Sequence, residues 1–135
     1  MTDFDSISLG QKAERSTLIS AKLVADFAAL TGDDNPVHLD EQYAAKSIFG
    51  RRVAHGMIAS SLIASLMGSE LPGWGTIYLG QNLEFRAPVF IDDTVTVSVE
   101  VLEKDDKTKR IKLKTQAVNQ DGRLVINGQA LVLYK

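Results

Sequence analysis

The chain has 135 residues, of which 44% are hydrophobic and 24% charged, as expected for one globular domain with a substantial core. A formal net charge of -2 excludes a domain-wide basic field that would recruit nucleic acid. The absence of cysteine excludes disulfides, thiolate metal sites and a cysteine nucleophile. We therefore expect a single domain over residues 1–135 with no nucleic-acid partner.

The N-terminal segment, MTDFDSISLGQK, is acidic and polar, and it lacks the basic and apolar regions of a signal peptide. The longest apolar run, residues 57–67, is about half the length that a membrane-spanning helix needs. These two features predict a cytoplasmic protein with no membrane segment.

Two amphipathic segments in the first third of the chain are predicted to be helices. The first covers residues 20–30, with Ser20 as a good N-cap and Thr31-Gly32 as the stop. Its apolar side chains recur at helical spacing: Leu23, Val24, Phe27 and Leu30. Residues 40–46 form a second, shorter candidate helix with Asp40 as its N-cap.

Residues 56–68, GMIASSLIASLMG, contain no charged side chain, and their polar members are three serines. A helix without a charged face is normally buried on most of its sides. Glycines and prolines then crowd residues 68–75, which indicates a loop. This segment therefore predicts a helix that the rest of the domain encloses.

The hydrophobic period changes from 3.6 to 2 after this loop, which predicts strands over residues 76–86, 94–103, 110–118 and 124–134. The alternation assigns these side chains to the buried face of the first two strands: Ile77, Leu79, Leu83, Phe85, Val95, Val97, Val99 and Val101. The third strand buries Ile111, Leu113 and Ala117 in the same way. Ala87-Pro88 is expected to break the ladder, because proline cannot donate to it.

Helices followed by consecutive antiparallel strands, each with one apolar face, indicate an α+β fold with the helices on one side of the sheet. Because the uncharged helix must be covered, we expect the sheet to curl around it. No repeat, low-complexity tract or linker interrupts this single domain.

The segment Gly32-Asp33-Asp34-Asn35-Pro36-Val37-His38 carries the clearest chemistry in the chain. The chain has only two histidines, and the other, His55, opens the uncharged helix. Asn-Pro favours a turn, which can bring His38 back towards Asp33. A carboxylate and an imidazole beside a helix start are the parts of a general acid/base site.

Four segments, residues 27–40, 53–57, 77–81 and 85–89, resemble the MaoC-like hot-dog proteins, and in particular the short (R)-specific enoyl-CoA hydratases. The similarity covers nearly the whole chain. It implies the hot-dog fold, a long buried helix wrapped by an antiparallel β-sheet, in a homodimer that needs no cofactor.

The resemblance also implies an activity, the addition of water to a trans-2-enoyl thioester of coenzyme A or acyl carrier protein to give the (R)-3-hydroxyacyl thioester. By the same resemblance, Asp33 and His38 activate the water and the Gly56 N–H polarises the thioester carbonyl. Asn35, His55 and Met57 are assigned to substrate binding. We also expect His55 to anchor the helix start through a hydrogen bond.

Several alternatives remain beside this interpretation. Asp33 has the sequence context of an ordinary turn carboxylate. Asp33, His38 and His55 are possible metal ligands, but the family is metal-free by resemblance, so we expect no metal. The competing functions are a hot-dog acyl-CoA thioesterase and a non-catalytic acyl-thioester-binding subunit of a heteromeric dehydratase. The sequence leaves acyl chain length, thioester carrier and physiological direction open.

Overall fold

The computed structural model describes residues 3–134. Its N-terminal part contains η1 (Phe4–Ser6), β1 (Lys12–Leu18), α1 (Ala21–Thr31), α2 (Pro36–Leu39), α3 (Glu41–Ala45) and α4 (Gly56–Ser69). Four strands follow: β2 (Thr76–Phe85), β3 (Thr94–Asp105), β4 (Arg110–Val118) and β5 (Leu124–Tyr134). Within residues 3–134, no helix is long and apolar enough to cross a membrane.

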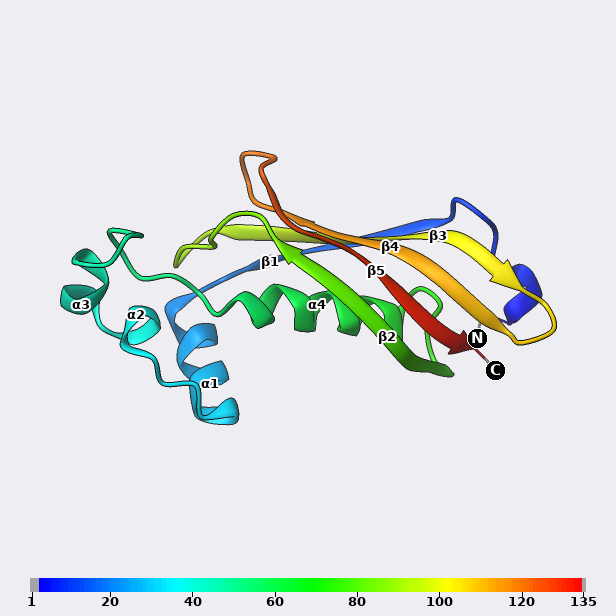
Figure 1. Cartoon of the computed structure of the whole chain (residues 1–135), viewed down its shortest axis with the longest axis horizontal. Coiled ribbons are helices and arrows are strands. Elements are labelled where there is room, and N and C mark those ends of the chain that lie inside the picture. Colours follow the sequence, from blue (N-terminus) through cyan, green and yellow to red (C-terminus); the bar gives the residue numbers. More distant parts are fainter. Residues whose placement is uncertain (1–2, 135) are drawn as a thin grey trace.

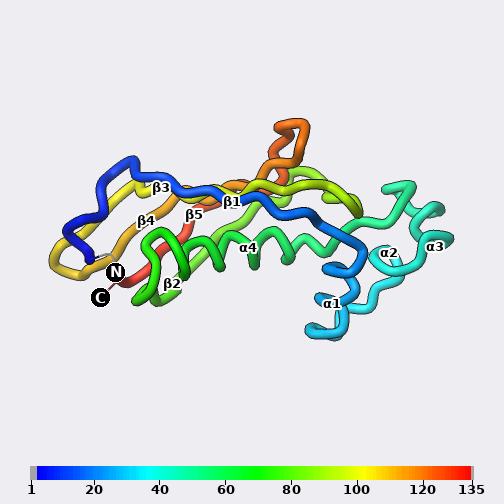
Figure 2. Tube along the Cα trace, turned by 180° about the vertical axis from the view of Figure 1, so that it is seen from behind, coloured from blue at the N-terminus to red at the C-terminus, as the bar shows by residue number. Residues whose placement is uncertain are grey.

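All five strands belong to one antiparallel sheet in the order β1-β3-β4-β5-β2. Helix α4 runs along one face of this sheet, and α1, α2 and α3 lie beyond the sheet at the end where α4 begins (Figure 1). Figure 2 shows the same arrangement from behind. The predicted α+β architecture is therefore confirmed, with α4 on one face of the sheet and the other three α-helices beyond its end (Figure 1).

The alternation of β3 and β4 produces the core as predicted. Val95, Val97, Val99 and Val101 of β3 and Ile111, Leu113 and Ala117 of β4 are all buried. They pack with the side chains that α4 turns towards the sheet: Ile58, Ile63, Leu66 and Met67. Burying such an aliphatic side chain stabilises the fold by about 1.5–3 kcal/mol, so this shared layer fixes α4 on the sheet.

The other side of α4 differs from the prediction of an enclosed helix. Met57, Ser61, Ser65 and Gly68 follow each other at helical spacing and are exposed. The missing charge does not force burial here, because small residues and serines make most of this side. Enclosure of α4 within one chain is therefore incomplete.

The predicted buried face of β2 was partly wrong. A β-bulge at Tyr78–Gly80 adds one residue, so Tyr78 and Gln81 pair with the inward-facing Val132 and Ala130 of β5. Directly paired residues share a face, so Ile77 lies on the opposite face from Leu83. The inserted residue reverses the alternation that the sequence pattern assumed.

The exposed fractions of the side chains of β2 also differ from the prediction. Ile77 is 50% exposed, Leu79 44% and Phe85 54%, although all three were predicted to be buried. The strand lies at the edge of the sheet, so no neighbouring strand within residues 3–134 covers its outer side. The predicted break at Ala87-Pro88 is confirmed, because β2 ends at Phe85.

Strand β1 was not predicted. Its half-buried face consists of Ala13, Arg15 and Thr17, which lacks the apolar alternation that reveals the other strands. Pairing with β3 from Lys12–Glu100 to Leu18–Thr94 forms it instead. Arg15 then reaches across to α4 and donates to Ser65 and Ser69.

Candidate active site

The turn after α1 places Asp33 and starts the next helix. Gly32 caps α1 in the left-handed conformation, with φ of 80°, which glycine adopts without steric cost. The side chain of Asn35 then accepts a hydrogen bond from the Val37 N–H at 3.1 Å and caps α2, whose first residue is Pro36. The predicted Asn-Pro turn is thus a capped helix start, and it carries His38 on the single turn that follows.

The imidazole of His38 has a defined orientation. Its Nδ1 lies 2.7 Å from the main-chain oxygen of Val53. A carbonyl oxygen only accepts, so Nδ1 carries the hydrogen, and in the neutral ring Nε2 keeps the free lone pair. Arg52 donates to the main-chain oxygen of His38 at 2.8 Å and holds the backbone of α2 from the same side.

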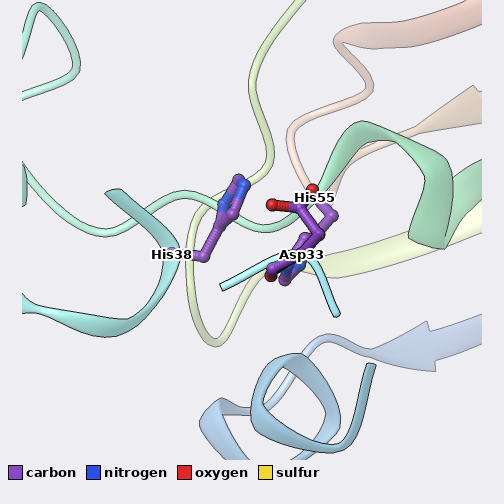
Figure 3. A group of neighbouring side chains, drawn as sticks. All are labelled: Asp33, His38 and His55. Atoms are coloured by element: carbon purple, nitrogen blue, oxygen red, sulfur yellow. Dashed lines mark hydrogen bonds between the residues drawn. The ribbon is translucent and has the colours of Figure 1, made fainter. Parts of the chain in front are cut away.

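The second histidine, His55, is buried against the ring of His38. His55 is 4% exposed, and its ring stacks on that of His38 with 3.8 Å between centroids and 27° between planes. Its Nε2 lies 2.9 Å from the main-chain oxygen of Asp33. Figure 3 shows Asp33, His38 and His55 gathered between α2 and the start of α4.

The expected hydrogen bond of His55 at the helix start is present, but it is made to the segment of Asp33 and not to α4 itself. His55 is the N-cap residue of α4, but its side chain makes no capping hydrogen bond there. The ring is turned towards Asp33, where a main-chain carbonyl accepts its N–H. The interaction is therefore between two parts of the site and leaves the first turn of α4 without a side-chain cap.

Gly56 is the first residue of α4. Within residues 3–134, its amide donates to no other group of the chain, as expected for the first turn of a helix. The 14-residue helix adds the positive end of its dipole at the same point. A Cβ at Gly56 would lie 3.0 Å from the ring of Phe85, so glycine keeps this approach to the amide open.

A cavity of about 460 Å³ lies beside these groups, but Asp33 is not among the residues that line it. Asn35, His38 and Gly56 line it, together with an apolar wall of Val37, Phe49, Val53, Ala54, Phe85, Pro88, Val89 and Val125. Three or four polar groups that converge on an apolar cleft are typical of small-molecule sites. A larger hollow of about 770 Å³ lies on the charged β3–β4 hairpin and contains none of the candidate residues.

Met57 and His55, both assigned to substrate binding, do not line this cavity. Met57 faces a neighbouring cavity of about 480 Å³ between α4 and β2, with Ser61, Tyr78 and Leu79. Burial raises the pKa of the Tyr78 hydroxyl, which stays protonated near neutral pH and donates to Gln81. His55 lies behind His38, out of the first cavity.

The spacing of the three polar side chains also suits a metal ion. Donor atoms of Asp33, His38 and His55 all lie within 4.8 Å of one another. One nitrogen of each ring is already hydrogen-bonded to a main-chain carbonyl, of Val53 and Asp33 respectively. The arrangement therefore holds two oriented imidazoles without any ion.

Sequence reasoning missed two residues of the site. Val53 acts through its carbonyl oxygen, which any residue would supply, so its identity gives no signal. Phe85 was assigned to the buried face of β2, whereas its ring forms a half-exposed wall of the cavity. Phe85 lies on the predicted face, since it pairs with the buried Ile126, but it stands at the end of the edge strand beside Gly56, a position that the sequence pattern does not give.

Comparison with known proteins shows which family this chain belongs to. Residues 5–122 match the family model described as MaoC like domain. The (R)-specific enoyl-CoA hydratase of Aeromonas caviae is 46% identical over 127 residues, covering 94% of this chain and 95% of that protein. The 3-hydroxybutyryl-CoA dehydratase of Methylorubrum extorquens is 42% identical, covering 96% and 82%.

The fold comparison agrees. The unliganded R-hydratase of Pseudomonas aeruginosa superimposes with a TM-score of 0.93 at 43% identity, covering 98% of this chain and 84% of that one. This match confirms the hot-dog fold expected from the resemblance. With most of its length matched by the family model and by relatives above 40% identity, the chain belongs to the MaoC-like family.

Proposed function

We propose that this chain is an (R)-specific enoyl-CoA hydratase, which adds water reversibly to trans-2-enoyl-CoA to give (R)-3-hydroxyacyl-CoA. The observation that supports this most is the arrangement of a carboxylate, an imidazole with a free Nε2 and an unpaired helix-start amide. Donor atoms of Asp33 and His38 lie within 4.8 Å of each other, and His38 and Gly56 line one cavity. The names of the relatives supply the reaction and its stereochemistry.

The Asp33–His38 pair is suited to activating one water molecule. Because Nδ1 of His38 donates to Val53, the lone pair of Nε2 is available to the water. In hydration, the water oxygen bonds to carbon 3 of the enoyl group while the pair takes one of its protons. A proton then passes from the pair to carbon 2, so that H₂O is added in sum. General acid/base steps of this kind contribute about 10² to 10⁴ in rate.

Negative charge builds on the thioester oxygen as water attacks. In this proposal the Gly56 amide and the start of α4 face that oxygen, because the Gly56 N–H makes no hydrogen bond within residues 3–134 and the helix start carries the positive end of the helix dipole. Removing one such oxyanion donor costs about 3–4 kcal/mol in known enzymes. Asn35 lines the same cavity, and we propose that its amide contacts the substrate near the Asp33–His38 pair.

The decisive experiment is a coupled assay on the purified chain with a series of trans-2-enoyl-CoA substrates. A hydratase removes the enoyl absorbance without releasing thiol, and chiral analysis then finds the (R)-3-hydroxyacyl product. Release of free thiol would instead identify the rival thioesterase. No activity of the chain alone, with activity restored by a second subunit, would identify a binding subunit of a heteromeric dehydratase. Acyl-carrier-protein thioesters in the same series test the carrier.

We also propose that the reaction needs neither a metal nor an organic cofactor. The proposed chemistry requires only proton transfer and one main-chain donor, and the orientation of both rings is explained by hydrogen bonds to Val53 and Asp33. Dialysis against a strong chelator should leave turnover unchanged. Loss of activity with recovery on adding a single divalent metal would reject this part of the proposal.

The assembly that we propose is a homodimer formed through β2. The two edges of the sheet differ in character, because β1 carries Lys12, Glu14 and Arg15 whereas β2 exposes Ile77 and Leu79. Charged edges resist pairing, and uncovered apolar edges favour it. A second copy at β2 would also cover the exposed side of α4.

We place this dimer in the cytoplasm, a location that cell fractionation with a specific antibody would test.

A further inference from the structure

Within residues 3–134, Nδ1 of His55 is the buried side-chain polar atom that lacks a hydrogen-bond partner. The small void beside the ring is lined by Ile19, Ile58, Val89 and Val95 and has no room for a water molecule. A buried acceptor without a donor destabilises a fold. Packing alone therefore does not explain a histidine at this position.

The other ring nitrogen of His55, Nε2, makes a hydrogen bond. Nε2 lies 2.9 Å from the main-chain oxygen of Asp33, which only accepts, so His55 carries its hydrogen on Nε2. Nδ1 is buried and finds no acceptor within residues 3–134, and this favours the same tautomer. The bond crosses 22 residues of sequence and holds the exposed segment of Asp33 against the start of α4.

The ring also supports the second member of the pair. His38 stacks on it with 3.8 Å between centroids, and Phe27 packs against His55 at 4.9 Å. One buried side chain thus touches the backbone of Asp33 through its edge and the imidazole of His38 through its face.

We infer that His55 is a positioning residue of the hydration site, which sets the distance between Asp33 and His38 as a neutral ring protonated on Nε2. This inference rests on the proposed function for its kinetic consequence. Errors of about 1 Å in the placement of catalytic groups can cost about 10²-fold in rate, so a loosened Asp33 segment should lower kcat more than it changes KM.

Three substitutions separate the edge contact from the face contact. His55→Gln places an amide N–H near the position of Nε2 and removes the ring. His55→Asn has the same chemistry but places its N–H near the position of Nδ1. His55→Phe keeps a stacking ring and removes the donor. Thermal melts and the oligomeric mass of each variant report whether it is folded.

For folded variants we expect kcat to fall about 10²-fold in His55→Asn and His55→Phe, with KM nearly unchanged. His55→Gln should recover part of this loss. Equal kcat in His55→Gln and His55→Asn, or full kcat in His55→Phe, would overturn the inference and leave His55 a packing residue.

A second measurement does not depend on activity or on a variant that folds. The chain has two histidines, so ¹⁵N-histidine labelling gives two ring systems, which His38→Gln assigns. At pH 8 we expect the Nε2–H tautomer for His55 and the opposite, Nδ1–H tautomer for His38. An Nδ1–H tautomer or a rapid mixture at His55 would reject the inference. If the wild type hydrates no enoyl thioester, the proposed function fails while this measurement still decides the tautomer and the contact.

Discussion

The carbonyl oxygen of Val53 lies 2.7 Å from Nδ1 of His38, so a main-chain group 15 residues away sets the tautomer of this imidazole. Two residues later, His55 donates to the backbone of Asp33, and Gly56 then begins α4. The four residues 53–56 thus contact His38 and Asp33 and supply the Gly56 amide, the three groups of the proposed mechanism. Its place is fixed by the Val53–Phe90 bridge and by the Ala54 amide, which donates to Val89.

The shared-water proposal predicts that Asp33 and His38 act as one unit. Asp33→Asn and His38→Gln should each lose about 10² to 10⁴ in kcat, with little change in melting temperature because both side chains are at least partly exposed. The double variant should be scarcely worse than either single one, since coupled catalytic groups are not additive. Losses in kcat that multiply fully in the double variant would contradict the shared water.

The dimer proposal predicts a different outcome for two similar substitutions. Leu79→Lys places a charge on the exposed apolar edge of β2, whereas Leu30→Lys places one on α1, where Leu30 is 84% exposed. Sedimentation at micromolar concentration should give a dimer for the wild type and for Leu30→Lys, and a monomer for Leu79→Lys. A fully active wild-type monomer would reject the assembly.

Strand ends and core faces were predictable where alternation is regular. The predicted strands at 110–118 and 124–134 match β4 and β5 residue for residue, because the register shift between β4 and β5 falls at the end of β4, at Ala117–Val118, and leaves most of the alternation intact. The proximity of Asp33 and His38 followed from the Asn35-Pro36 turn. In contrast, the bulge of β2 and the half-polar strand β1 depend on their pairing partners, which a local pattern does not contain.

The hydrogen bonds to the backbone of Val53 and Asp33 were not predictable for a related reason. Each joins a histidine to a carbonyl more than ten residues away, and every residue has such a carbonyl. Only the three-dimensional path of the chain selects which one accepts. The sequence therefore names the candidate groups of the site but not the hydrogen bonds that orient them.

Asp105 should make the β3–β4 hairpin sensitive to acid. Hydrogen bonds from the backbone N–H groups of Thr108 and then Lys107 lower the pKa of its carboxyl below the usual 3.8. A lowered folded-state pKa contributes stability above the unfolded value, and this contribution is lost as the pH falls through the folded value. Asp105→Asn should therefore melt below the wild type at pH 7, and this difference should shrink below about pH 3–4. A constant difference would exclude the charge as its cause.

Gly128 should be the glycine of the sheet that tolerates a side chain least. A Cβ on Gly128 would lie 2.1 Å from the main-chain oxygen of Asn82 in the paired strand β2, which backbone pairing prevents from moving away. We expect Gly128→Ala to lower the free energy of unfolding by at least about 1–3 kcal/mol, the usual cost of overpacking. Gly80→Ala is the control, because a Cβ there meets nothing within 4 Å. Equal melts would show that the two strands separate readily.

The start of α4 allows the main-chain proposal to be tested without removing any polar group. Gly56→Ala keeps the amide but places a Cβ 3.0–3.1 Å from ring atoms of Phe85, which lines the same cavity. The methyl group and the displaced ring narrow the space in front of the amide, so turnover should fall. Gly68→Ala, where a Cβ meets nothing within 4 Å, should keep full turnover and gain up to about 1 kcal/mol of helix stability. Helix propensity alone predicts that neither substitution harms activity. Steady-state kinetics beside thermal melts separate the two accounts, because a well-folded Gly56→Ala variant with wild-type turnover would remove Gly56 from the site.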